Sequence, residues 1–190
     1  MALVGRLGIL KSHFLPGQFN PLGKYTRREY DLARAYVVIA HAEIEAYIED
    51  RATEIAQRAE SNWQRMGRCS EVIRGICTSH NARTNQPWLP FAKDPKRIKS
   101  ALNFYKKLIR KNHGIKEANL LRLVFPLGIQ YQKIDATLMT DLEAFGSFRG
   151  GIAHSSIKTQ QPIDIEGQYK KVEAIIKRLK VLDRKINQLR

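Results

Sequence analysis

Cysteine is scarce in this sequence, in which Cys69 and Cys77 are the only two among 190 residues. If both lie on one helix, their spacing places them about 12 Å apart along the axis, whereas the Cα atoms of a disulfide lie within about 7 Å of each other. We therefore expect free thiols and a reducing, cytoplasmic setting. Together with His80, the two thiols do not form the short cysteine pair that is typical of structural zinc sites, so we expect no metal ion and no cofactor.

Long apolar runs are also missing. No stretch approaches the roughly 20 apolar residues of a membrane-spanning helix, so we expect no membrane protein. The segment 1–10 is rich in apolar side chains, but it lacks a basic start, and Arg6 and Lys11 interrupt the apolar run. We therefore expect no signal peptide. Apolar and polar residues nowhere sustain the period of two that is typical of strands, which argues against a β-sheet.

Acidic residues are too few to balance the basic ones. The chain has 33 Lys and Arg residues against 18 Asp and Glu residues, which gives a formal net charge of +15. Such an excess favours polyanionic partners, with nucleic acid first, an acidic protein second and an anionic membrane third. The alternative is a basic surface that only keeps the protein soluble.

The positive charge is concentrated in residues 93–122, which hold ten Lys or Arg and two acidic residues, a net of +8. Charge runs are most often the solvated faces of amphipathic helices. The size of the imbalance nevertheless favours a surface that faces phosphates. The candidates for contact with RNA phosphates are Lys106, Lys107, Arg110 and Lys111.

Apolar residues recur at steps of three and four over most of the chain, the spacing of amphipathic helices. Thr26 and Glu29 have capping-box spacing at the start of one such segment, and Asp94 and Pro95 have the order of a helix start. The predicted helices cover about 26–60, 69–79, 94–113, 116–124, 131–148 and 164–190, with a loop at 81–91. We therefore predict an all-α helical bundle.

The start of the chain differs in composition from the rest. Residues 1–24 contain Pro16, Pro21 and several glycines, which are typical of irregular structure. We predict an N-terminal arm over 1–24 with little regular structure, followed by one helical domain over 25–190.

A segment late in the chain carries the residues that are best suited to chemistry. Arg149 and His154 stand five positions apart, and Gly150 and Gly151 follow the arginine directly. On an unbroken helix five positions turn by about 140°, so the two side chains would not share a face. We predict that the two glycines interrupt or kink the helix and let another backbone or a nucleic-acid strand approach closely.

The spacing of Arg149 and His154 resembles the signature of the HEPN superfamily, an arginine followed four to six residues later by a histidine. The segment 30–45 resembles the first helix of RiboL-PSP-type HEPN domains, and Pro162-Ile163-Asp164 resembles the connector to their final helix. The resemblance covers roughly residues 25–190. Many active members carry Asn, Asp or His directly after the arginine, where this chain has Gly150.

The resemblance implies metal-independent cleavage of single-stranded RNA that leaves a cyclic phosphate and a 5′-hydroxyl. It implies a homodimer in which the two Arg–His pairs meet at the interface. It also implies a place in bacterial toxin–antitoxin or phage-defence systems, with an antitoxin or another protein as a partner. Glu43 and Glu45, in the stretch that resembles the first helix, are candidates for orienting the basic motif, although a solvated helix face explains them equally well.

The residue types suit that chemistry. RNA carries its own nucleophile, the 2′-hydroxyl, so cleavage needs a base for its proton and a cation for the charged transition state. Histidine titrates near neutrality and suits the first role, and the guanidinium fork of arginine matches phosphate oxygens. The structural alternative is that Arg149 caps or pairs near a helix end and that His154 is a satisfied buried polar group.

Two other functions stay open at the level of the sequence. One is a catalytically inactive HEPN module that binds RNA or a protein partner, which Gly150 favours. The other is a helical assembly subunit in which the spacing of Arg149 and His154 is fortuitous, which burial and separation of the two side chains would favour.

The charge of residues 93–122 generates a prediction about salt. We expect the affinity for single-stranded RNA to fall steeply between 50 and 200 mM salt, roughly, because Lys and Arg side chains release counterions from phosphates. Fluorescence anisotropy with a labelled oligonucleotide measures this slope. An affinity that stays flat across the range would contradict the electrostatic role of this segment.

Overall fold

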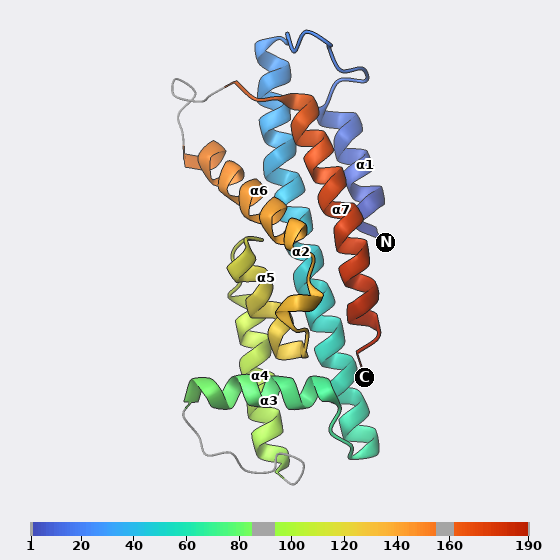
Figure 1. Cartoon of the computed structure of the whole chain (residues 1–190), viewed down its shortest axis with the longest axis vertical. Coiled ribbons are helices and arrows are strands. Elements are labelled where there is room, and N and C mark those ends of the chain that lie inside the picture. Colours follow the sequence, from blue (N-terminus) through green and yellow to red (C-terminus); the bar gives the residue numbers. More distant parts are fainter. Residues whose placement is uncertain (1, 85–93, 155–161, 190) are drawn as a thin grey trace. The chain divides into compact units, whose positions relative to one another are not determined.

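The computed structural model describes residues 2–84, 94–154 and 162–189, and all regular structure in these ranges is helical (Figure 1). This confirms the all-α prediction. In chain order the elements are α1 (Ala2–Phe14), α2 (Arg27–Met66), α3 (Glu71–Thr84), α4 (Pro95–Arg110), α5 (Glu117–Val124), the 3₁₀ turns η2 (Phe125–Leu127) and η3 (Tyr131–Lys133), α6 (Ala136–His154) and α7 (Ile165–Asn187).

The helices divide between two compact units. The first unit comprises Met1–Tyr47, Gly114–Glu117 and Ala136–Lys180, and the second comprises Ile48–His113, Ala118–Asp135 and Val181–Arg190. The long helices α2 and α7 therefore each contribute their first part to the first unit and their last part to the second.

Side-chain caps fix the starts of two helices where the sequence predicts them. Before α2, the Thr26 amide donates to Glu29 Oε2 at 2.7 Å, and the Glu29 amide donates to Thr26 Oγ1 at 3.3 Å. The Thr26 hydroxyl also donates to Glu29 Oε2, and the bonds from the Thr26 amide and hydroxyl hold the pKa of the Glu29 carboxyl below its usual range. Before α4, Asp94 Oδ1 accepts from the amides of Lys96 and Arg97 at 3.0 and 3.2 Å. Both caps satisfy amides that have no partner inside the helix.

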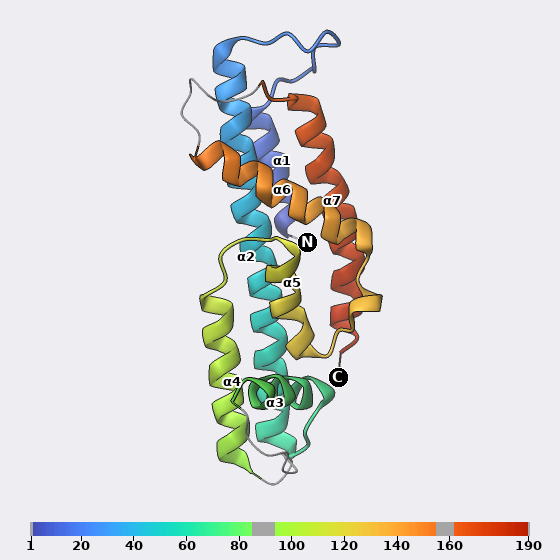
Figure 2. The same ribbon diagram turned by 60° about the vertical axis from the view of Figure 1, so that its left-hand side comes forward.

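The first unit is built around the N-terminal part of α2. Figures 1 and 2 show α1 and the first part of α7 running alongside this segment, while α6 crosses it at an angle. The apolar faces of all four helices point inward. The buried side chains include Leu3, Leu7 and Leu10 of α1, Tyr36, Val37, Ala40 and Ile44 of α2, Leu138, Leu142 and Phe145 of α6, and Val172, Ile175 and Leu179 of α7.

The second unit packs α3 against α4 and η2, and α3 lies crosswise to α4 (Figure 2). Gly75 makes the contact with η2 close, because a Cβ atom there would lie 2.6 Å from the carbonyl oxygen of Pro126. The buried Tyr105 hydroxyl of α4 donates to the Leu123 carbonyl at 2.6 Å. These contacts hold α3 against α4 and η2, and α5 against α4.

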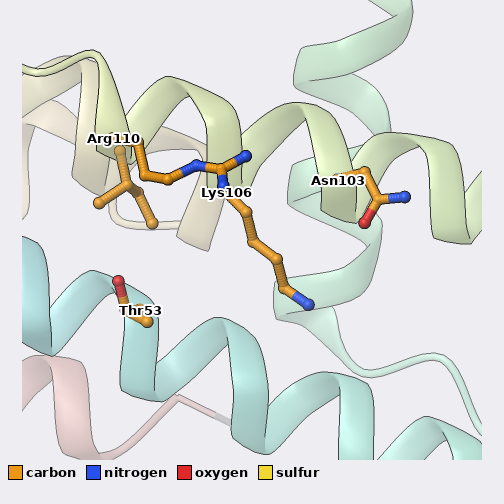
Figure 3. Close-up of a pocket in the computed structure, with 5 residues that line it drawn as sticks. Thr53, Asn103, Lys106 and Arg110 are labelled. Atoms are coloured by element: carbon orange, nitrogen blue, oxygen red, sulfur yellow. The ribbon is translucent and has the colours of Figure 1, made fainter.

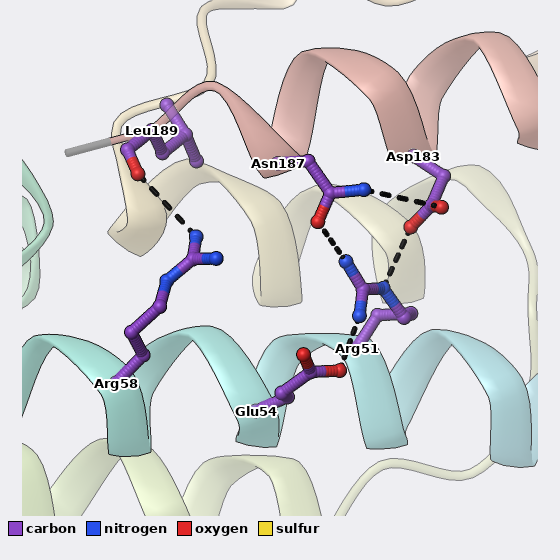
Figure 4. Close-up of polar contacts among 6 residues, drawn as sticks. All are labelled: Arg51, Glu54, Arg58, Asp183, Asn187 and Leu189. Carbon is purple, nitrogen blue, oxygen red and sulfur yellow. Dashed lines mark hydrogen bonds and ion pairs between the residues drawn. The ribbon is translucent and has the colours of Figure 1, made fainter.

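The end of α7 is tied to the second part of α2 by polar contacts (Figure 4). Arg51 Nε donates to Asp183 Oδ1 at 2.6 Å, and the same guanidinium contacts Glu54 and Asn187. About two turns further along α2, the guanidinium of Arg58 donates to the Leu189 carbonyl at 3.4 Å. The guanidinium of Arg51 is half-buried, so its contacts are shielded from solvent more than those of a surface pair.

The prediction of little regular structure over residues 1–24 is wrong for residues 2–14, which form α1. Burial of one apolar face offsets the low helix propensity of Gly5 and Gly8, and no atom lies within 4 Å of where a Cβ would stand at either glycine. Residues 15–26 are without helix, and Pro16 and Pro21 lie there.

The structure also corrects several predicted bounds. Helix α2 continues to Met66, and α3 takes in residues 81–84 of the predicted loop, whose remaining residues lie outside the described ranges.

Helix α6 begins at Ala136 and runs through Gly150 and Gly151 to His154, so the predicted interruption is wrong. Two glycines cost a helix about 1 kcal/mol each, which lowers stability without breaking the backbone hydrogen bonds.

Candidate functional site

Helix α6 carries Arg149 and His154 in different surroundings. Arg149 is half-buried, whereas His154 is the last residue of the helix and is exposed. Because the helix is unbroken, the two positions differ by about 140° around the axis and about 7.5 Å along it. One chain therefore does not direct both side chains at the same point.

Arg149 lies on the face of α6 that packs against α2. Gly146, one turn earlier on that face, lies next to His41, since a Cβ at Gly146 would lie 3.8 Å from His41 Nε2. The ring of Phe145 stacks on the imidazole with centroids 6.2 Å apart. The charge of Arg149 acts on His41 across this contact. Arg149 and His41 thus form one polar cluster inside the first unit.

His41 is held neutral by its surroundings. Its residue surface is 3% exposed, and this burial lowers the pKa of the imidazole below its ordinary value, with the positive charge of Arg149 lowering it further. Glu45 acts in the opposite direction, with its Oε2 atom 3.6 Å from His41 Nδ1. Burial outweighs this carboxylate, so the pKa moves down.

The two candidate acids of the first-helix segment have different partners. The Glu45 carboxylate accepts from the Gly114 amide and lies beside His41. Glu43 instead pairs with Arg6 of α1 at 2.7 Å. The structure therefore brings Glu45 to the Arg149–His41 cluster and directs Glu43 to α1.

A lysine and a glutamate border the same cluster. Lys116 Nζ pairs with Glu143 Oε1 at 3.2 Å, and Glu143 Oε2 also accepts from the Glu117 amide at 3.3 Å. A Cβ at Gly146 would lie 2.9 Å from Lys116 Cγ. The absence of a side chain at Gly146 therefore gives Lys116 room beside α6.

The basic candidates of α4 lie in the second unit. Lys107, Arg110 and Lys111 are exposed, whereas the half-buried Lys106 pairs with Glu60 at 2.5 Å. Lys106 and Arg110 line a hollow of about 380 Å³ together with Thr53 and Asn103 (Figure 3). Lys107, Arg110 and Lys111 therefore face solvent, whereas Lys106 is held in its ion pair with Glu60.

The sequence does not single out His41. The signal that was available is its place on an apolar stripe, since Val37 lies four positions before it and Ile44 three positions after it, and both are fully buried. A histidine on such a stripe enters the core and needs a polar partner there. The sequence does not show that the partner cluster contains Arg149.

Two classes of feature are missing from the described part of the chain. Within residues 2–84, 94–154 and 162–189, no group of three or more His, Cys, Asp or Glu side chains is arranged to hold a metal ion. No described helix is both long and apolar enough to cross a membrane.

Comparison with protein families matches residues 13–188 to the RiboL-PSP-HEPN family. The match covers most of the chain, so this protein belongs to the RiboL-PSP-HEPN family of the HEPN superfamily, whose members are generally associated with ribonuclease activity. Comparison with curated proteins and with solved structures gives no significant match. The family assignment confirms the resemblance that the sequence carries at Arg149 and His154.

The lowered pKa of His41 predicts how the free energy of unfolding depends on pH. The unfolded chain has a histidine pKa of about 6.5, and the folded value lies below it. Between these two values the unfolded chain binds a proton that the folded chain does not, so stability rises with pH. The contribution is complete above pH 6.5, roughly, and is lost as pH falls towards the folded value.

We therefore expect the difference in stability between the wild type and His41→Gln to shrink as pH falls from about 7.5 to 5, by at most about 1.4 kcal/mol per pH unit. Urea denaturation at a series of pH values measures this difference. Subtracting the variant removes the contributions of the other histidines. A difference that is independent of pH would contradict the buried, neutral state of His41.

Proposed function

We propose that the protein is an endoribonuclease that cleaves single-stranded RNA by attack of the 2′-hydroxyl, with Arg149 and His154 as its catalytic residues. The observation that carries the proposal is the position of both residues at the end of α6, inside the region that matches a family generally associated with ribonuclease activity. The exposure of His154 supports access to substrate.

The proposed reaction uses the 2′-hydroxyl of the RNA itself together with arginine and histidine side chains. His154 takes the proton of the 2′-hydroxyl, and the 2′-oxygen attacks the adjacent phosphorus. The bond from phosphorus to the 5′-oxygen then breaks, which leaves a 2′,3′-cyclic phosphate, and a second, protonated histidine, which a second copy of the chain supplies, donates its proton to the departing oxygen. The guanidinium of Arg149 stabilises the charge that develops on the phosphate oxygens.

The geometry of α6 supports a site shared by two copies of the chain. Arg149 and His154 of one chain point about 140° apart, and one histidine cannot be base and acid at the same moment. A twofold axis near the end of α6 supplies a second arginine and a second histidine, because a symmetric interface brings like segments together. We therefore propose a homodimer.

The exposed cations of α4 extend the proposal to RNA binding. Lys107, Arg110 and Lys111 face solvent, and cations of this kind bind the phosphate backbone without regard to sequence. Lys106 is the weaker candidate, because Glu60 already neutralises it. These residues support affinity for RNA rather than the chemical step.

A second candidate function is a HEPN module that binds RNA or a protein partner without cleaving. Gly150 favours it, because the position after Arg149 lacks the polar side chain of many active members. The biological setting that we propose for either function is a bacterial toxin–antitoxin or phage-defence system, in which an antitoxin is the protein partner.

The proposed mechanism predicts that Arg149→Ala and His154→Ala each lower the cleavage rate by about 10²–10⁴-fold. His154 is exposed and Arg149 is half-buried near the end of α6, so the fold and its circular dichroism should change little. The assay follows a labelled single-stranded RNA in EDTA, with His113→Ala as the matched control for loss of an exposed histidine. A rate that survives both alanine substitutions would refute these assignments, and an inactive wild type would favour the binding module.

The shared site predicts a dimer in solution. Size-exclusion chromatography with light scattering should give twice the mass of one 21.8 kDa chain at the concentrations where cleavage is observed. The mass should stay doubled in His154→Ala, because an exposed side chain is not expected to hold the interface together. Full activity in a protein that remains monomeric would rule out the shared site.

A further inference from the structure

Two polar atoms in the Arg149–His41 cluster are buried without a hydrogen-bond partner. They are the Nε atom of Arg149 and the Nδ1 atom of His41. Native proteins pair more than nine in ten of their buried polar groups, with ordered water often acting as the partner. An arginine Nε–H is always a donor, and a neutral imidazole always has one nitrogen that accepts. The two side chains are therefore chemically complementary.

The contacts of His41 indicate which nitrogen accepts. Nδ1 has no hydrogen-bond partner, but Glu45 Oε2 lies 3.6 Å away, and the negative charge of this carboxylate favours the proton on Nδ1 over Nε2. Nε2 then carries the lone pair, and it faces α6 at Gly146. Arg149 stands three residues after Gly146, which places it one turn along the same face of α6. Nε2 therefore faces the side of α6 on which Arg149 lies.

The other charged groups around the imidazole already have partners. On its own helix, Glu45 accepts from the Gly114 amide. Lys116, from the 114–117 segment, and Glu143, from α6, pair with each other, and Glu143 also accepts from the Glu117 amide. His41 is left as the neutral acceptor beside Arg149, and a neutral acceptor leaves the positive charge of the guanidinium uncompensated.

We propose that His41 is a positioning residue, whose Nε2 accepts a hydrogen bond that one buried water relays from Arg149 Nε–H, because the two side chains are not bonded to each other directly. This inference rests on the proposed ribonuclease function, because it assigns to His41 the orientation of the catalytic arginine. A guanidinium held at Nε keeps its two terminal nitrogens free, and these form the fork that binds two phosphate oxygens. Glu45 completes the arrangement by holding the imidazole in the required tautomer.

The direct test is nuclear magnetic resonance of the Arg149 Nε–H group in the full chain. In the wild type this proton should exchange slowly with water and give a resolved signal, which Arg149→Lys assigns by its disappearance. His41→Phe keeps the volume of the ring and removes the acceptor, so the signal should be lost. His41→Gln retains an acceptor oxygen and should restore it. His80→Gln, in the second unit, is the matched control and should leave the signal unchanged.

The wild type supplies a second readout that does not depend on any variant folding. Protonation of His41 removes the lone pair of Nε2, so the Arg149 signal should disappear with the same midpoint as the titration of the His41 ring protons. An Arg149 signal that is unchanged in His41→Phe, or that ignores the titration of His41, would overturn the inference.

Kinetics separates this inference from the proposed function. His41→Phe should lower kcat by up to about 10²-fold, the cost of a misplaced group, while KM for RNA stays within a few-fold. His41→Gln should recover most of the loss. Equal losses in the two variants would indicate a merely structural role for His41 and overturn the inference. An inactive wild type would refute the proposed function, and the resonance of Arg149 would still decide whether His41 positions the arginine.

Discussion

The contact between α6 and α2 at Gly146 is the constraint on which the site depends. Because position 146 has no side chain, the side chain of Lys116 fits beside α6, and His41 Nε2 faces the helix at the distance of an ordinary van der Waals contact. The same contact buries Phe145 against His41 and sets Arg149 one turn further along. A permanent positive charge is thereby held half-buried, where electrostatic interactions are stronger than in water.

This burial gives the two ends of the Arg149–His154 motif different properties. The arginine is oriented by packing and by the neutral histidine of α2, whereas His154 lies exposed on the last turn of α6. In the proposed cleavage by the 2′-hydroxyl, an oriented cation suits the stabilisation of charge on the phosphate, and an accessible imidazole suits the transfer of a proton. The unbroken helix separates them within one chain, and pairing of two chains resolves that separation in the proposed mechanism.

Local signals in the sequence were enough to predict the helical class, the helix starts at Thr26 and Asp94, and the family. Caps and apolar stripes act over a few residues, so the sequence displays them directly. The continuation of α6 through Gly150 was not predictable in this way, because glycine permits a bend without requiring one. The role of His41 was missed because its cluster joins α2, α6 and the segment around Gly114, which only the folded chain brings together.

The chemistry of the RNA ends tests the central claim most directly. Mass spectrometry of the products that the wild type forms from single-stranded RNA in EDTA should show a 2′,3′-cyclic phosphate on one fragment and a 5′-hydroxyl on the other. RNA with a 2′-O-methyl group at the scissile position should remain intact, because it has lost the nucleophile. Products with 3′-hydroxyl and 5′-phosphate ends, or cleavage of the 2′-O-methyl substrate, would contradict the roles that we propose for Arg149 and His154.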